Sequence, residues 1–110
     1  EANNLEVPKT WDEFYDAAVA LTKDGVYGCG FSCSPNDLLC TRYLNYYVRS
    51  GGGSLLNDDL TANLTSDLAI DGINFWVKVY KNCSPAKTIN YTVNDHATLY
   101  YQGTTAFDFL

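Results

Sequence analysis

The sequence lacks methionine, has a single histidine, and contains only seven lysine and arginine residues among its 110. These basic residues form no cluster, and the formal net charge is −6. Nucleic-acid binding needs a basic patch that displaces counterions from phosphates, and anionic lipid surfaces attract patches of the same kind. The charge pattern therefore argues against nucleic acid and against a charged membrane surface as partners.

Long hydrophobic runs are also absent. The hydrophobic fraction is 46%, but the apolar runs extend over only a few residues, whereas a spanning helix needs about 20. The first six residues are polar and acidic and do not resemble a signal peptide. We therefore expect no membrane span, and a chain that is cytosolic or already processed. A chain of this length has room for one domain with one core.

The four cysteines favour an oxidising, extracellular compartment, because disulfides persist there and not in the cytosol. They can form two disulfides in one of three connectivities, and buried free thiols are the alternative. Three N-x-S/T sequons add a weak indication of a secreted glycoprotein. The cysteines are Cys29, Cys33, Cys40 and Cys83, and the sequon asparagines are Asn63, Asn82 and Asn90. The predicted location is extracellular or secreted.

The chain is organised around the stretch from Phe31 to Thr41, where a short strand predicted at 26–31 leads into a helix predicted at about 35–49. Ser34 can cap this helix, Pro35 suits its first position, and Asp37 completes a spacing like that of a capping box. In α/β proteins, small polar ligands bind beyond the carboxyl ends of strands, where helix N-termini present unpaired N–H groups. We therefore predict this turn as the functional centre.

The remaining pattern predicts an α/β fold with about four helices, short strands and a small hairpin. Thr10 and Glu13 form a capping box, and Asp24-Gly25 is expected to end the first helix. Ser50-Gly51-Gly52-Gly53 is expected to end the second helix. A hairpin is expected around Asn57-Asp58-Asp59, followed by a helix at about 67–82 capped by Thr65 or Ser66, a short helix at 95–102 capped by Thr92 or Asn94, and a strand at 104–109. The apolar stripe of the long helix comprises Ala69, Ile70, Ile73, Trp76, Val77 and Tyr80.

The sequence offers little for catalysis or for metal binding. The lone histidine, His96, lies in the first turn of a predicted helix and is expected to be an exposed structural residue, with no nucleophile motif beside it. The pair Asp58-Asp59 is typical of a solvated bend. The cysteine spacing lacks the paired C-x2-C of zinc sites. We predict no enzyme, no metal site and no cofactor.

Nine tyrosines and two tryptophans can line a sugar site by stacking, but most of them have the helical spacing of core residues. We assign Trp11, Phe14, Phe75 and Trp76 to packing. Tyr43, which is nearest to the turn, is a candidate ligand contact.

The order of several short phrases, from Val7 to Phe109, resembles the central part of extracellular solute-binding proteins of the sugar-binding, maltodextrin-binding-like type that serve ABC importers. These phrases are Val7-Pro8-Lys9-Thr10-Trp11-Asp12-Glu13-Phe14, Ala17-Ala18, Leu21-Thr22, Asp24-Gly25-Val26-Tyr27-Gly28, Gly51-Gly52-Gly53-Ser54-Leu55-Leu56, Leu64-Thr65-Ser66, Ala69-Ile70 and Tyr101-Gln102-Gly103-Thr104-Thr105-Ala106-Phe107. The resemblance comes from their order and spacing together.

This resemblance implies a partial periplasmic-binding-protein-like lobe, with residues 1–110 forming a single domain or a fragment that corresponds to much of the second lobe. Such proteins are not enzymes, and their two α/β lobes close by a hinge motion on a small, sugar-like ligand. The implied partners are that ligand, the remaining lobe, and a membrane transporter or receptor assembly. The implied ligand contacts lie in the turn and comprise Ser34, Asn36, Asp37 and Thr41, with Tyr43 nearby.

The chain departs from the family pattern in three ways. The aromatic segment that commonly follows the last strand lies beyond Leu110, the first lobe is missing, and Cys33 and Cys40 flank the turn. A disulfide between these two cysteines would stiffen the turn. The alternative function is that of a structural or interaction domain in a larger disulfide-linked, glycosylated extracellular assembly.

Overall fold

The computed structural model describes residues 3–35, 37 and 40–109. Its elements are α1 (Trp11–Leu21), β1 (Tyr27–Gly30), α2 (Cys40–Ser50), α3 (Asp67–Cys83), the 3₁₀ helix η1 (Ala86–Asn90), α4 (Val93–Tyr101) and β2 (Thr105–Asp108). In the part of the chain thus described, the predicted α/β class with four helices and short strands is confirmed.

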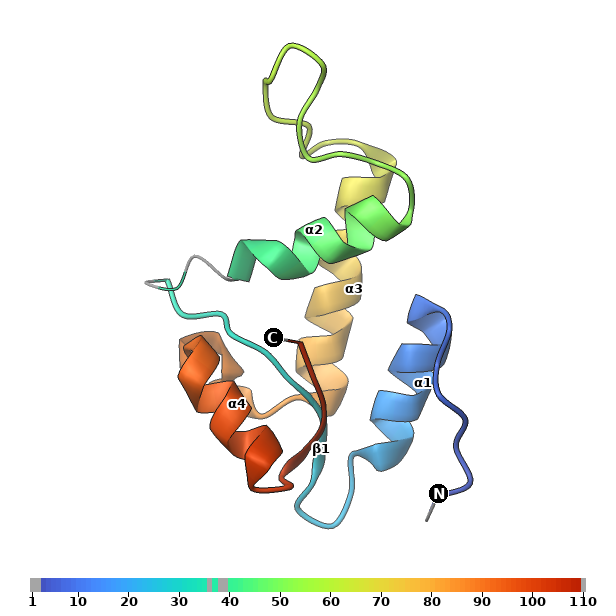
Figure 1. The fold of residues 1–110 in the computed structure, drawn as a ribbon, viewed down its shortest axis with the longest axis vertical. Helices are drawn as coiled ribbons and strands as arrows, with labels where there is room; N and C mark the ends of the chain where they lie inside the picture. The colour runs from blue at the N-terminus through green and yellow to red at the C-terminus, as the bar shows by residue number, and fades with distance from the viewer. Residues whose placement is uncertain (1–2, 36, 38–39, 110) are drawn as a thin grey trace.

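The two strands form a parallel pair at the centre of the molecule. Tyr27 pairs with Thr105 and Gly30 with Asp108. Helix α1 packs on β1, helix α4 packs on β2, and the two helices lie on opposite sides of the strand pair (Figure 1). Helix α3 packs on β1 and is crossed by α2. Because the strands are parallel, their carboxyl ends lie at the same edge of the sheet.

Helix α1 begins as predicted. The backbone N–H of Glu13 donates to Thr10 Oγ1 at 3.2 Å, and the Glu13 carboxylate accepts from the N–H of Thr10 at 3.3 Å. The predicted end at Asp24-Gly25 is wrong, because the helix stops at Leu21. Asp24 and Gly25 instead have φ of 55° and 83°, in a tight turn. The turn leads α1 directly into β1.

Removing the hydroxyl of Thr10 tests how much the cap of α1 contributes to the stability of the protein. We expect Thr10→Ala to lower the free energy of unfolding by about 1 kcal/mol, because the N–H of Glu13 loses its acceptor. Urea unfolding of the full-length protein measures the loss. Thr10→Ser, which keeps a hydroxyl, is the matched control and should retain most of the stability; equal losses in both variants would argue against the cap.

Helix α2 begins at Cys40 and not at Pro35, so the predicted cap at Ser34 is wrong. The backbone N–H groups of Cys33 and Ser34 both donate to the carbonyl of Tyr91, at 3.1 and 3.0 Å. These bonds hold Cys33 and Ser34 against the segment that precedes α4. The chain therefore stays non-helical at Ser34, although the local sequence favours a helix start there. The end of α2 is as predicted, at Ser50 before three glycines.

Helix α3 matches its predicted range, with Ser66 Oγ accepting from the N–H of Ala69 at 3.3 Å. The predicted apolar stripe is only partly buried, because Ile70, Ile73 and Val77 remain 46%, 45% and 44% exposed. The buried face is rotated toward Gly72, where an added Cβ would lie 2.8 Å from Leu44 of α2. The close approach of α2 therefore decides which face of α3 is covered.

The predicted hairpin and the last helix are both present. Leu56 and Ala62 form an antiparallel bridge, and the hairpin projects away from the rest of the fold (Figure 1). Helix α4 begins at Val93, two residues before the predicted start, with Thr92 and Asp95 forming its capping box. The expectation that His96 is exposed is wrong, because its side chain is completely buried.

The core is mostly aromatic. Phe14, Phe75 and Trp76 are buried as predicted, and Trp11 packs against them. The rings of Phe14 and Phe107 meet edge to face with centroids 5.1 Å apart, which joins α1 to β2. The indole N–H of Trp76 donates to the carbonyl of Tyr43 at 2.7 Å, which joins α3 to α2. This cluster packs against the strand pair.

Candidate ligand-binding site

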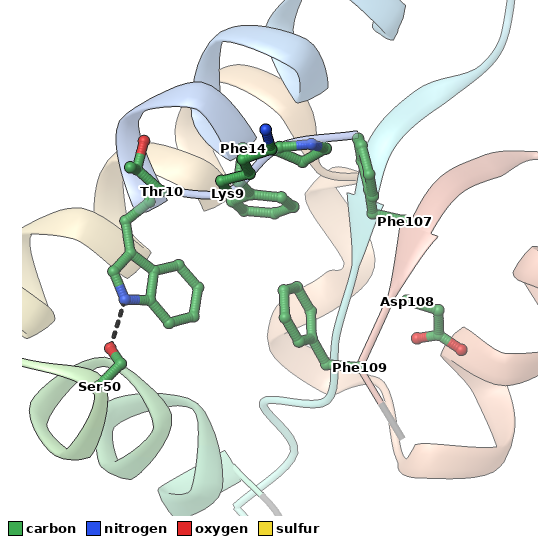
Figure 2. A pocket seen from close by; sticks show the side chains of 9 residues that line it. Lys9, Thr10, Phe14, Ser50, Phe107, Asp108 and Phe109 are labelled. Atoms are coloured by element: carbon green, nitrogen blue, oxygen red, sulfur yellow. Dashed lines mark hydrogen bonds between the residues drawn. The ribbon is translucent and has the colours of Figure 1, made fainter. Parts of the chain in front are cut away.

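An open pocket of about 600 Å³ lies where the end of β2 meets the start of α1. It is lined by Pro8, Lys9, Thr10, Trp11, Phe14, Ser50, Phe107, Asp108 and Phe109. We call it the strand-end pocket. Phe14 and Phe109 line it side by side, in edge-to-face contact with ring centroids 5.3 Å apart, and Figure 2 shows the carboxylate of Asp108 pointing away from Phe109. The carboxyl ends of parallel strands are the usual place for ligands in α/β folds.

Trp11 and Phe109 form the aromatic wall of the strand-end pocket. Their rings are nearly parallel, with centroids 6.2 Å apart and an interplanar angle of 29°, and both side chains are half-buried. The indole N–H of Trp11 donates to Ser50 Oγ at 2.6 Å, and Ser50 in turn donates to the carbonyl of Tyr47 at 2.9 Å. These bonds fix the orientation of the indole before any ligand arrives.

Polar groups stand beside this aromatic wall. Lys9 and Thr10 line the pocket and are exposed. A wall of aromatic rings with a few polar groups is typical of small-molecule sites, in which the rings supply contact area and the polar groups fix orientation. Sugars suit such a wall because they present both apolar C–H faces and hydroxyl groups.

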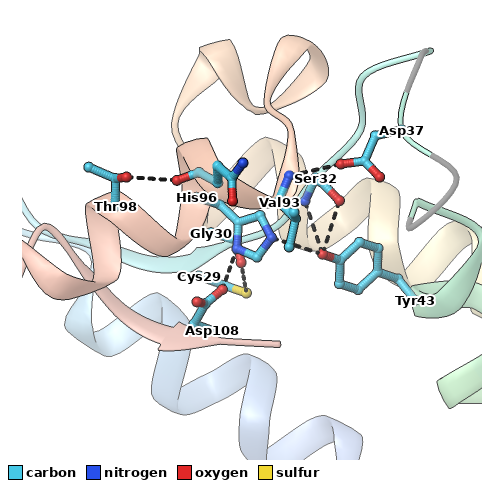
Figure 3. A network of polar contacts seen from close by, with 10 residues as sticks. Cys29, Gly30, Ser32, Asp37, Tyr43, Val93, His96, Thr98 and Asp108 are labelled. Carbon is cyan, nitrogen blue, oxygen red and sulfur yellow. Dashed lines mark hydrogen bonds and ion pairs between the residues drawn. The ribbon is translucent and has the colours of Figure 1, made fainter. Parts of the chain in front are cut away.

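The predicted ligand contact Tyr43 belongs to the core, with only 4% of its surface exposed. Its hydroxyl oxygen accepts from the N–H of Ser32 at 3.1 Å and lies 3.4 Å from His96 Nε2 (Figure 3). Burial raises the pKa of the Tyr43 phenol. The tyrosine therefore holds α2 against the end of β1, and its hydroxyl does not face the strand-end pocket.

His96 continues this contact toward β2. Its Nδ1 lies 2.5 Å from Asp108 Oδ1, and both side chains are buried. The other carboxylate oxygen, Asp108 Oδ2, is buried with no hydrogen-bond partner among the described residues. Ser32, Tyr43, His96 and Asp108 thus form a chain of contacts, the polar relay, that crosses from the end of β1 to β2 (Figure 3).

Of the other predicted contacts, Asp37 lies against the start of α4. Asp37 Oδ2 accepts from the N–H of Val93 at 2.8 Å and so caps α4 (Figure 3). Ser34 is buried and Thr41 is exposed in the first turn of α2. Asn36 lies outside the described residues. Among the described members of the predicted set, none lines the strand-end pocket.

Sequence reasoning missed the two residues of the aromatic wall. Trp11 was assigned to packing, and it does pack, but it also lines the strand-end pocket. Phe109 received no role. Applying the strand-end rule to the last strand as well as to the first would have pointed to Phe109, since the two strands are parallel and end at one edge.

The four cysteines carry free thiols in this structure, and the two disulfides stay a prediction. Cys29 and Cys83 are buried, whereas Cys33 and Cys40 are half-buried. Burial raises the pKa of Cys33 and of Cys83 to about 11. Of the sequon asparagines, Asn82 and Asn90 are exposed and Asn63 is half-buried. Glycosylation of all three stays a prediction.

None of the helices among the described residues has the length and apolar character needed to cross a bilayer. No three histidine, cysteine, aspartate or glutamate side chains in this part of the chain gather as ligands for a metal ion.

A parallel strand pair flanked by helices, with an open aromatic pocket at the strand ends, is an arrangement typical of α/β ligand-binding proteins. A family model described as bacterial extracellular solute-binding protein matches residues 1–110. The chain belongs to this family, which confirms the resemblance and the predicted extracellular location. The family consists of binding proteins, in agreement with the prediction that the chain is not an enzyme.

Two solved structures show the same fold. A solute-binding protein of an ABC transporter from Agrobacterium radiobacter K84, in complex with ribitol, superposes with a TM-score of 0.87 at 23% identity over 97% of this chain. One from Thermotoga lettingae TMO, bound with α-D-tagatose, gives 0.83 at 30% identity over 94%. The chain covers 27% of the length of each. A search of curated proteins found no match.

Proposed function

We propose that residues 1–110 form much of the second lobe of an extracellular solute-binding protein that binds a small sugar or polyol between two lobes. The observation that carries the proposal is the strand-end pocket with its wall of Trp11 and Phe109. The ribitol and tagatose complexes of the two similar proteins support this ligand class. The other lobe would cover the pocket when the hinge closes, and the loaded protein would deliver its ligand to an ABC transporter.

The aromatic wall determines what the site accepts. A sugar or polyol places C–H groups on a ring face, and the stacking adds affinity beyond the area that it buries. The hydrogen bond from Trp11 to Ser50 keeps the indole in place without a ligand, so little side-chain freedom is lost on binding. The turn from Ser34 to Thr41 stays a proposed second source of contacts, with Asn36 and Asp37 its candidate polar groups.

A purely structural role in a glycosylated assembly is the less favoured alternative. The family and its ligand-bound relatives are binding proteins, and the pocket at the strand ends has the composition of a ligand site. No observation on the described residues favours the structural role over binding.

The test is calorimetry on the full-length protein with pentitols, ketohexoses and small oligosaccharides. We expect one of these classes to bind, and we expect Trp11→Ala to raise its Kd about fivefold, since ring stacking contributes on the order of 1 kcal/mol. Tyr101→Ala is the matched control, because Tyr101 is an aromatic residue that is 78% exposed and lies away from the pocket. Its Kd should equal that of the wild type.

Because Trp11 also packs in the core, folding must be checked separately. Circular dichroism should show that Trp11→Ala remains folded, and Phe109→Leu provides a second, smaller change to the same wall. Failure of every ligand class to release heat or to raise the melting temperature of the folded protein would remove the sugar and polyol proposal.

A further inference from the structure

We propose that the four cysteines form two disulfides with a defined pairing, Cys33 with Cys40 and Cys29 with Cys83. The sequence alone allows three connectivities. The inference rests on which thiols the fold brings together and on the extracellular location of the family. It does not depend on the identity of the ligand.

Cys33 and Cys40 meet at a small cavity of about 260 Å³ between α2 and α3. Cys33 follows the end of β1, and Cys40 is the first residue of α2. Both are half-buried and both line this cavity, together with Phe31 and Trp76. The Cys40 thiol is also one of the groups that raise the pKa of Cys33, after burial itself. The fold therefore brings both thiols to the wall of one cavity.

Cys29 and Cys83 meet inside the core. Cys29 lies in β1, Cys83 is the last residue of α3, and α3 packs on β1. Both are buried in the same core cluster. After burial, the Cys83 thiol is the strongest of the groups that raise the pKa of Cys29. Each thiol has only a weak contact to a nearby carbonyl, Gly30 for Cys29 at 3.5 Å and Val79 for Cys83 at 3.2 Å, so bridging them gives up little.

The bonds form by thiol–disulfide exchange with a disulfide-bearing oxidant of the extracellular compartment. One cysteine thiolate attacks a sulfur of the oxidant and gives a mixed disulfide, and the second cysteine then displaces the oxidant. Each pair loses two protons and two electrons, and the oxidant leaves as a dithiol. Since thiolate is the reacting form, the raised pKa of Cys33 and Cys83 slows the exchange once these thiols are buried.

The two bridges would act on different parts of the fold. A Cys33–Cys40 bond closes a loop of seven residue steps around the turn beside the strand ends. A Cys29–Cys83 bond ties β1 to the end of α3 across 54 residue steps. Long loops lose more chain entropy on cross-linking in the unfolded state, so the core bond should contribute more to stability.

Peptide mapping of the unreduced, alkylated full-length protein, recovered from its export compartment, tests the pairing. Trypsin leaves Cys29, Cys33 and Cys40 on residues 24–42 and Cys83 on residues 82–87. All three connectivities therefore give one linked species of the same mass. Chymotrypsin then cleaves after Phe31 and separates Cys29 from Cys33 and Cys40.

After the second cleavage, we expect residues 82–87 to remain attached to the fragment that contains Cys29. We expect the fragment 32–42 to carry an internal bridge and to be lighter by two hydrogens than its reduced form. Attachment of residues 82–87 to the fragment 32–42 would overturn the pairing. Alkylation of all four thiols without prior reduction would overturn the disulfides altogether and leave buried free thiols.

Serine variants give an independent measurement. A reductant should lower the melting temperature of the wild-type protein. The variant C33S/C40S should keep most of this sensitivity, whereas C29S/C83S should lose most of it, because the longer loop is then open in both conditions. Equal melting temperatures of the wild type with and without reductant would count against both bonds.

Discussion

Gly28→Ala is expected to prevent the chain from folding into its native structure. A Cβ at this position would lie 2.0 Å from the carbonyl oxygen of Ala18, and 2.5 and 2.6 Å from its carbonyl carbon and Cα. All three are backbone atoms of α1 and cannot turn aside. Overpacking costs about 1–3 kcal/mol where side chains can give, so we expect a larger loss here, visible as a loss of near-UV circular dichroism.

Gly72→Ala is the matched control for this prediction. An added Cβ there would meet the ends of two side chains, Leu44 at 2.8 Å and Tyr47 at 3.0 Å, which can shift. Alanine is also better than glycine in a helix by about 1 kcal/mol, which offsets part of the crowding. We expect this variant to fold with a small change in its urea midpoint. Should Gly28→Ala unfold at the wild-type midpoint, the close packing of α1 on β1 is incorrect.

Breaking the contact between His96 and Asp108 should have the next largest effect. His96→Leu leaves the buried Asp108 carboxylate without its partner, and Asp108→Leu leaves the imidazole with only its 3.4 Å contact to the Tyr43 hydroxyl. Removing one member of a buried pair costs about 3–5 kcal/mol, because the remaining group is buried and uncompensated. Urea unfolding of the full-length protein measures both losses.

The double variant H96L/D108L separates the pair from simple packing. It leaves neither polar group behind, so we expect it to be more stable than either single variant. Additive losses in the double variant would mean that the two residues act independently. The polar relay would then carry no coupling between α4 and β2.

Local signals explain what the sequence could predict. The caps at Thr10 and Ser66 and the glycines after Ser50 act through neighbouring residues, so the helix limits that they set are found where expected. The family resemblance could also be predicted, because it depends on the order and spacing of short sequence phrases along the chain. The start of α2 could not be predicted, because the carbonyl of Tyr91, more than 50 residues away, holds Cys33 and Ser34.

The candidate site depended on contacts of the same long-range kind. Nothing near Tyr43 in the sequence shows that its hydroxyl meets Ser32 and His96, or that its ring is buried in the core. The exposure of His96 was misjudged because its partner Asp108 lies on a different element. The spacing of apolar residues in α3 likewise does not show that the buried face is turned away from Ile73. That orientation follows from the close approach of α2 at Gly72.

The pairing of Tyr27 with Thr105 imposes an order of assembly on the chain. The two residues are 78 positions apart, and α2, α3 and α4 all lie between them. Contacts this distant in sequence form late, because the loop between them must be closed first. During synthesis, β1 leaves the ribosome long before its only described neighbouring strand exists, so the strand-end pocket is among the last features of this fold to form.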